Sequence, residues 1–224
     1  MHTTQAARSI VSIRRQDENY PTRLNDLYDP PEELYIYGDM NLLYQPMIAI
    51  VGSRNASIRG VLAARAFARA LSQAGLVVLS GLARGIDGAA HQGALDLVTG
   101  PTVAVCGTGL DIVYPREHTK LAGAIAQRGL LVSEFPLGTG PKPFHFPKRN
   151  RLIAALALGV VVIEAVEKSG SLITARIAVD LGREVFALPG PIDDPLYQGC
   201  NRLIQQGAKL VGSPQEVLED LLIV

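Results

Sequence analysis

The densest group of residues able to bind an anionic ligand lies in FHFPKRNR, residues 144–151. From residue 135 to residue 163 the chain has no Asp or Glu, so the positive potential of this stretch is locally unopposed. Aromatic faces beside cations are typical of single-stranded nucleic-acid binding, in which bases stack while Lys or Arg contact the backbone. The segment therefore predicts a nucleic-acid contact surface made of Phe144, Phe146, Lys148, Arg149 and Arg151, with Lys142 close by in the sequence.

A different interpretation of the same segment stays open. The phenylalanines would belong to the core and the basic residues would form a solvated helix start, although cations at a helix N-terminus oppose the helix dipole. Arg149 or Arg151 could also form a buried structural ion pair with Glu134 or Glu164.

Short turns rich in Gly and Ser follow several apolar runs, and these turns have the chemistry of phosphate binding. Glycines let a ligand approach the backbone, free N–H groups at helix starts attract anions, and hydroxyls donate to phosphate oxygens. Ligands of open α/β sheets bind where the strands end, so the turns predict a phosphate-binding rim. Its candidate residues are Gly52, Ser53 and Arg54, then Ser80, Gly81 and Arg84, then Gly107, Thr108 and Gly109, then Ser133 and Glu134, and then Ser169, Gly170, Ser171 and Thr174.

Signatures of the common nucleotide-binding and catalytic classes are missing. Gly107 and Gly109 are followed by Ile112 where a dinucleotide-binding loop needs a third glycine, and no window fits a P-loop. Asp87 and His91 lie four residues apart on an expected helix, but a helix-dipole contact and a loop hydrogen bond explain them more simply than a metal or an acid–base pair. No serine or cysteine has the surroundings of a nucleophile. We expect no catalytic residue, metal or cofactor.

The turns are positioned by a repeating pattern of a short β-branched run, a turn and an Ala-rich amphipathic segment. It recurs over residues 47–75, 76–98, 102–129, 159–182 and 183–210, with a further strand expected over 130–138. Apolar runs that alternate with helices are typical of a parallel sheet covered on both faces. We therefore predict an α/β fold with a doubly wound, mostly parallel sheet. Gly75, Gly129 and Gly182 fall at expected helix ends, where a left-handed residue is favoured.

The chain divides by pattern into three parts. Residues 1–45 are expected to form an N-terminal extension with an edge strand and a short helix, residues 46–212 the main domain, and residues 213–224 a C-terminal helix or tail. The 224 residues carry 21 basic and 21 acidic side chains, so nucleic-acid binding depends on a local patch rather than on net charge. Two distant cysteines and the lack of a stretch of roughly 18 apolar residues predict a cytoplasmic protein without membrane contact.

Several segments, in order, resemble the successive signatures of the DNA-processing protein A family (DprA, also called Smf). They are IAIVGSR, LSGLARGIDGAAH, CGTGLDIVYPREH, SEFPLGTGPKPFHFPKRNRLIA, EAVEKSGSLITARIAVDLGREVFALPG and GCNRLIQQGAKL. The resemblance extends from about Ile10 to Leu210. It implies an extended Rossmann-like domain that binds single-stranded DNA, usually as a homodimer, and is not an enzyme. It also implies protection of incoming strands during natural transformation and loading of the RecA recombinase.

The resemblance also implies which residues bind DNA. They are Gly52, Ser53 and Arg54, then Phe146, Lys148, Arg149, Asn150 and Arg151, and then Ser169, Gly170, Ser171 and Thr174. Many members have further domains on both sides of this region. The alternative is a small-nucleotide sensor or a phosphoribohydrolase-like enzyme of related fold. The phosphoribohydrolases have a P-G-G-x-G-T turn, whereas this chain has PGPID at residues 189–193.

Overall fold

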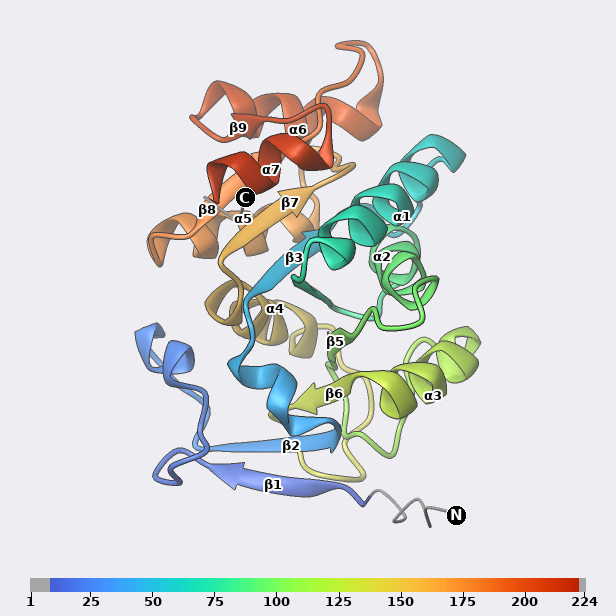
Figure 1. Ribbon diagram of the computed structural model, residues 1–224. Helices are drawn as coiled ribbons and strands as arrows, with labels where there is room; N and C mark the ends of the chain where they lie inside the picture. The colour runs from blue at the N-terminus through green and yellow to red at the C-terminus, as the bar shows by residue number, and fades with distance from the viewer. Residues whose placement is uncertain (1–8, 222–224) are drawn as a thin grey trace.

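The computed structural model describes residues 9–221, and these form one sheet of nine strands in the order β1-β2-β6-β5-β4-β3-β7-β8-β9 (Figure 1). The strands are β1 (Val11–Arg14), β2 (Glu33–Gly38), β3 (Met47–Val51), β4 (Val77–Ser80), β5 (Thr102–Val105), β6 (Leu130–Ser133), β7 (Gly159–Val162), β8 (Glu184–Ala187) and β9 (Lys209–Leu210). All neighbours from β6 to β9 in this order pair in parallel. The predicted fold class is confirmed.

The N-terminal extension adds two strands to the sheet, where the sequence predicted one. β1 pairs antiparallel with β2, and β2 pairs antiparallel with β6, so of these two strands only β1 lies at an edge of the sheet. Two 3-10 helices, η1 (Thr22–Asp26) and η2 (Met40–Tyr44), replace the expected short helix. The sequence gives only a weak signal for the second strand, β2, because its residues alternate between buried and half-buried and its flanks are rich in Pro, Asp and Tyr.

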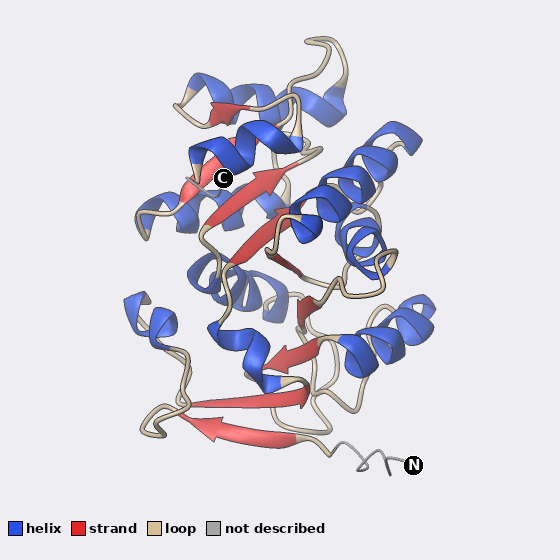
Figure 2. Ribbon diagram, viewed as in Figure 1, coloured by secondary structure: helices blue, strands red, loops and turns tan. Residues whose placement is uncertain are grey.

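Helices cover both faces of the sheet, as Figure 2 shows. Shared buried clusters place α1 (Ile58–Gln73), α2 (Ile86–Leu95), α3 (Thr119–Arg128) and α7 (Pro214–Asp220) on one face. The other face carries α4 (His145–Leu156), α5 (Gly170–Asp180) and α6 (Pro195–Gln205). Every residue of β3 and β7 is buried, which explains their continuous apolar sequences.

Two of the expected helix ends take the left-handed conformation and the third does not. Gly75 and Gly182 follow α1 and α5 with φ of 91° and 67°. Gly129 ends α3 with φ of −148°, and glycine is needed there because a Cβ would lie 2.1 Å from the Thr102 carbonyl oxygen. The helix of the final repeat, α6, begins at Pro195, capped by Asp194, and ends at Gln205.

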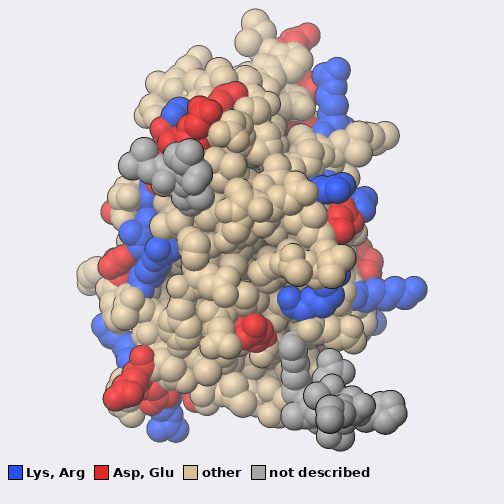
Figure 3. All heavy atoms as spheres, viewed as in Figure 1, with Lys and Arg blue, Asp and Glu red and all other residues tan. Residues whose placement is uncertain are grey.

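Within residues 9–221, no helix is long and apolar enough to cross a membrane. On the face seen in Figure 3, basic and acidic side chains surround a broad area of uncharged residues, in keeping with the zero net charge of the chain. Any anion site must therefore be local.

Candidate functional site

A crevice opens where the strand order reverses. After β3 the chain continues to β4 on one side, whereas after the adjacent β7 it continues to β8 on the other, so the two loops diverge. A cavity of about 480 Å³ lies between them. It brings together many of the residues predicted from the sequence: Gly52, Ser53, Arg54, Arg149, Asn150, Ser169, Gly170, Ser171 and Thr174.

The loop that carries Arg54 is held at both ends. Ser57 caps α1 by accepting from the Gly60 amide at 3.0 Å, and its own amide donates to the fully buried Glu164 carboxylate at 2.9 Å. Gly52 must lack a side chain, because a Cβ there would lie 2.8 Å from the Glu164 carbonyl oxygen. Glu164 therefore holds the loop, and no arginine among residues 9–221 forms an ion pair with it.

Arg54 is the exposed cation of this crevice. Its guanidinium lies 5.2 Å from the centroid of the Phe146 ring. Among the described residues no carboxylate lies within ion-pair distance of it, in contrast to Arg84, which pairs with Glu117. A cation held against an aromatic ring and without a counter-ion is available to an anionic ligand.

The start of α5 supplies neutral anion-binding groups. Ser169 is the N-cap and its hydroxyl accepts from the Ser171 amide at 3.3 Å. The two hydroxyls of Ser169 and Ser171 lie 2.7 Å apart, and Thr174 lies one turn further along the cavity wall. Hydroxyls and helix-start N–H groups are the donors that phosphate oxygens prefer.

Arg149 forms part of the cavity wall but is itself structural. It is 3% exposed, and one guanidinium nitrogen donates to the carbonyl oxygens of Gly81 and Val105 at the ends of β4 and β5. Asp87 lies beside it, accepting from the Gly81 amide at 3.1 Å. Burial lowers the pKa of Arg149 and raises the pKa of Asp87, while their mutual attraction opposes both shifts.

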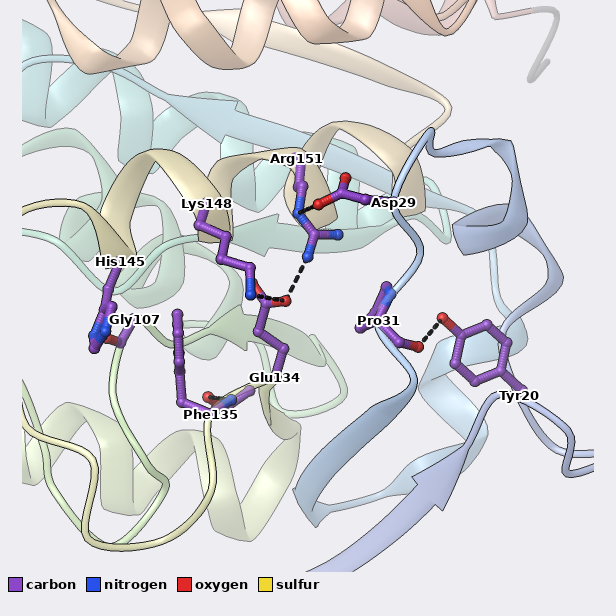
Figure 4. Close-up of polar contacts among 10 residues, drawn as sticks. Tyr20, Asp29, Pro31, Gly107, Glu134, Phe135, His145, Lys148 and Arg151 are labelled. Atoms are coloured by element: carbon purple, nitrogen blue, oxygen red, sulfur yellow. Dashed lines mark hydrogen bonds and ion pairs between the residues drawn. The ribbon is translucent and has the colours of Figure 1, made fainter.

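Lys148 and Arg151 lie on a different side of α4 and outside the cavity. Figure 4 shows the Glu134 carboxylate between them. Arg151 forms a close ion pair with Glu134, Lys148 Nζ lies 3.3 Å from the same carboxylate oxygen, and Asp29 lies 3.6 Å from Arg151 Nε. The structural interpretation that the sequence left open is thus confirmed for Arg151. Burial raises the pKa of Glu134, and the two cations oppose this shift.

Phe144, Thr108 and Gly109 also lie outside the main cavity. Phe144 is 65% exposed and contacts His145 edge to face at 4.7 Å, while His145 stacks on Phe135 (Figure 4). Thr108 is buried and donates to the Ile112 carbonyl, and the Gly109 amide donates to the Thr139 carbonyl. Both potential phosphate donors are therefore used within the protein, and Gly107 instead lines a smaller adjoining cavity.

Asp87 and His91 do not form a metal site. His91 is fully buried, its Nδ1 lies 2.8 Å from the Thr102 hydroxyl, and burial lowers its pKa to about 3. Thr102 donates its own proton to Val78, so His91 is the donor to Thr102. Within the described part of the chain no group of three or more His, Cys, Asp or Glu side chains could hold a metal ion.

Sequence reasoning missed Tyr114 and Pro115. Both line the smaller cavity next to Phe146, and the Tyr114 ring centroid lies 5.4 Å from that of Phe146. Both residues lie in CGTGLDIVYPREH, one of the segments that carry the family resemblance, and this segment is the signal that could have indicated them.

Comparison with known proteins gives consistent results. Residues 11–222 match the model of the family described as DNA recombination-mediator protein A. Protein Smf of Escherichia coli is 48% identical over 93% of this chain and 56% of its own length. The X-ray structure of DNA processing protein A from Streptococcus pneumoniae has a TM-score of 0.90 at 47% identity, with 94% of this chain and 74% of that one covered.

A further solved structure is that of DNA processing protein A from Helicobacter pylori, described for its single-stranded DNA binding mode. It has a TM-score of 0.84 at 33% identity, with 96% of each chain covered. The present chain thus spans nearly all of the Helicobacter structure but only about half of the Escherichia coli protein.

Proposed function

Since the chain belongs to the DNA recombination-mediator protein A family, we propose that it binds single-stranded DNA in the crevice between β3 and β7. The observation that carries the proposal is the exposed Arg54, which is held against Phe146, has no carboxylate partner within residues 9–221 and lines a cavity of about 480 Å³. The Helicobacter pylori relative, described for its single-stranded DNA binding, supports it.

Each part of the crevice has a role in this binding. Arg54 contacts a phosphate, the start of α5 donates hydrogen bonds to its oxygens from Ser169 and Ser171, and a base stacks against Phe146. Asn150 lies at the boundary, since it lines both the main cavity and an adjoining one of about 360 Å³ that also contains Phe146. Arg149, Arg151 and Lys148 act indirectly, by fixing α4 to the sheet.

The proposed role in the cell rests on the family resemblance and goes beyond the geometry. The protein protects incoming strands during natural transformation in the cytoplasm and promotes loading of RecA on them, without catalysis and as a homodimer. Dimerisation would join two crevices and raise the avidity for one strand. The sequence resemblance and the family membership support this role.

A small-nucleotide sensor is the second candidate, favoured by the volume of the main cavity, which falls in the range of small-molecule sites. The two candidates differ in a competition experiment. A sensor releases a labelled oligonucleotide when millimolar mononucleotide is added, whereas a strand binder that gains affinity from several nucleotides retains it.

The first test is anisotropy with a fluorescent dT oligonucleotide. We expect Arg54→Ala to weaken binding by about 10- to 100-fold, the range for a hydrogen bond between charged groups. Arg69→Ala is the matched control, because Arg69 is an exposed arginine on α1 outside the cavity lining. Equal affinities of the wild type and Arg54→Ala, with both proteins folded, would reject the crevice as the DNA site.

A further inference from the structure

Arg84 lies beside Arg54 in the fold, on the loop between β4 and α2. Gly85, the next residue, has a positive φ of 68°, and a Cβ there would lie 2.3 Å from the Ser53 carbonyl oxygen. The Ile86 amide donates to the same carbonyl oxygen at 3.2 Å. The loops that carry the two arginines are therefore in direct contact, and both arginines line a cavity of about 190 Å³ that adjoins the main one.

The charge of Arg84 is compensated by a carboxylate from another segment. Glu117 lies in η3 (Arg116–His118), and Arg84 donates to both of its carboxylate oxygens, with the Nη2 contact at 2.8 Å. The hydrogen bond from Arg84 lowers the pKa of Glu117, so this carboxylate is charged at neutral pH. Two neighbouring arginines thus differ: Arg54 has no carboxylate partner among residues 9–221, whereas Arg84 has one.

A phosphate can replace Glu117 as the partner of Arg84. The side chains of Arg84 and Glu117 are 58% and 50% exposed, and ion pairs in contact with water contribute little to stability. A guanidinium binds two oxygens of a phosphate with the same planar geometry that it uses for a carboxylate. A strand bound at Arg54 therefore offers Arg84 a second anionic partner.

The backbone around Glu117 is held by contacts other than this ion pair. His118 Nδ1 donates to the Leu82 carbonyl oxygen at 2.9 Å, which joins η3 to the loop of Arg84. The His118 amide donates to the Pro115 carbonyl oxygen at 3.0 Å. Loss of the Glu117 charge should therefore free the Arg84 side chain without moving the segment.

We propose that Arg84 is a second phosphate-binding residue of the single-strand site and that Glu117 competes with the strand for it. This inference rests on the DNA binding proposed above. The strand contacts Arg54 directly, but its contact with Arg84 requires the guanidinium to leave Glu117. The affinity is therefore lower than the two cations would allow, and removal of the competing carboxylate raises it.

The test measures the affinity for a fluorescent dT oligonucleotide by anisotropy over a range of salt concentrations. Glu117→Gln removes the competing charge and keeps the shape of the side chain. We expect binding to become about two- to fivefold tighter, the factor that corresponds to an exposed ion pair. The slope of log affinity against log salt should become steeper by about 0.7, because one more strand phosphate is then neutralised.

Asp96→Asn is the matched control. Arg65 and Asp96 form an exposed pair of the same kind, in which Nε lies 2.6 Å and Nη2 2.7 Å from the carboxylate oxygens. Neither residue lines any of the three described cavities that contain Arg54. This variant raises the net charge by one unit, as Glu117→Gln does, and it should change neither the affinity nor the salt slope.

The double variant Arg84→Ala, Glu117→Gln shows whether the gain depends on Arg84. Arg84→Ala alone should weaken binding by about two- to fivefold, and in its presence Glu117→Gln should leave the salt slope unchanged. A slope that becomes steeper without Arg84, or a gain that Asp96→Asn reproduces, would show that net charge alone strengthens binding, and the inference would be wrong. Thermal unfolding checks that each variant is folded.

Two further results separate this inference from the proposed function. Loss of affinity in Arg54→Ala together with unchanged affinity in Glu117→Gln keeps the crevice as the DNA site and rejects the role of Arg84. A wild type and a Glu117→Gln variant that both fail to bind the strand overturn both proposals.

Discussion

The two sides of helix α4 carry different residues in different surroundings. On one side Phe146 and Asn150 face the crevice and Phe146 meets Arg54, a cation without a carboxylate partner among the described residues. On the other side Lys148 and Arg151 share the Glu134 carboxylate (Figure 4).

This difference shows that the cation content of a segment does not predict which of its cations lack a carboxylate partner. Glu134 precedes Arg151 by 17 residues and Asp29 lies in the N-terminal extension, yet both are beside Arg151 in the fold. The basic segment has no acidic residue of its own, so its neutralisation comes from other elements. Arg54 lies in the loop after β3 and has no carboxylate partner among the described residues, so it is a better candidate for phosphate binding than Lys148 or Arg151.

The largest effect on stability is expected when Glu134, which pairs with Lys148 and Arg151 on one side of α4, is replaced. Glu134→Ala leaves Arg151 buried without its main counter-ion, which should lower the free energy of unfolding by about 3 to 5 kcal/mol. The affinity of the folded variant for single-stranded DNA should stay within about twofold of the wild type. Urea denaturation and anisotropy at a temperature where the variant is folded measure the two quantities.

Asp29→Ala is the matched control for Glu134→Ala. Asp29 is 62% exposed and lies 3.6 Å from Arg151, so its loss should cost less than about 1 kcal/mol. Similar costs for the two variants would mean that the buried pair does not stabilise the fold. A Glu134→Ala variant that is stable but binds DNA weakly would place Glu134 in the binding site.

His91 is buried without a counter-ion among the described residues, so its contribution to the stability of the fold should depend on pH. In the unfolded chain His91 takes up a proton near its ordinary pKa of 6.5, whereas in the fold it does so only near about 3. Between these values the unfolded state binds more protons, so stability is lost as the pH falls. This residue should contribute a slope approaching about 1.4 kcal/mol per pH unit.

Urea denaturation of the wild type and His91→Gln at several pH values between 7 and 4.5 isolates this contribution, because the other titrating groups are common to both proteins. The difference in the free energy of unfolding should change steadily below pH 6.5. Parallel pH profiles would show that His91 does not resist protonation in the fold.

Much of the fold and half of the site could be predicted from the sequence, for identifiable reasons. The β-branched runs predicted the parallel strands. The turns after β3 and β7 could be placed at one edge of the sheet because parallel strands end on the same side. The position of Tyr114 beside Phe146 could not be predicted from periodicity, because the two residues are far apart in sequence and no helix or strand contains Tyr114. The sequence left the role of Arg151 open because that role depends on its ion pair with Glu134, and no local pattern predicts the direction of the Glu134 side chain.

The smallest effects on stability and DNA affinity are expected for Lys148→Ala. This variant compares the two sides of α4 most directly. Lys148 is half exposed and its ion pair with Glu134 has a nitrogen–oxygen distance of 3.3 Å, so its loss should cost less than about 1 kcal/mol of stability. Because its charge is neutralised by Glu134, the dependence of DNA affinity on salt should stay that of the wild type. Arg54→Ala should make the slope of log affinity against log salt shallower by about 0.7, the value for one single-strand phosphate contact. A Lys148→Ala slope that is shallower by the same amount would show that Lys148 leaves Glu134 to bind a phosphate, and the paired side of α4 would then belong to the DNA site.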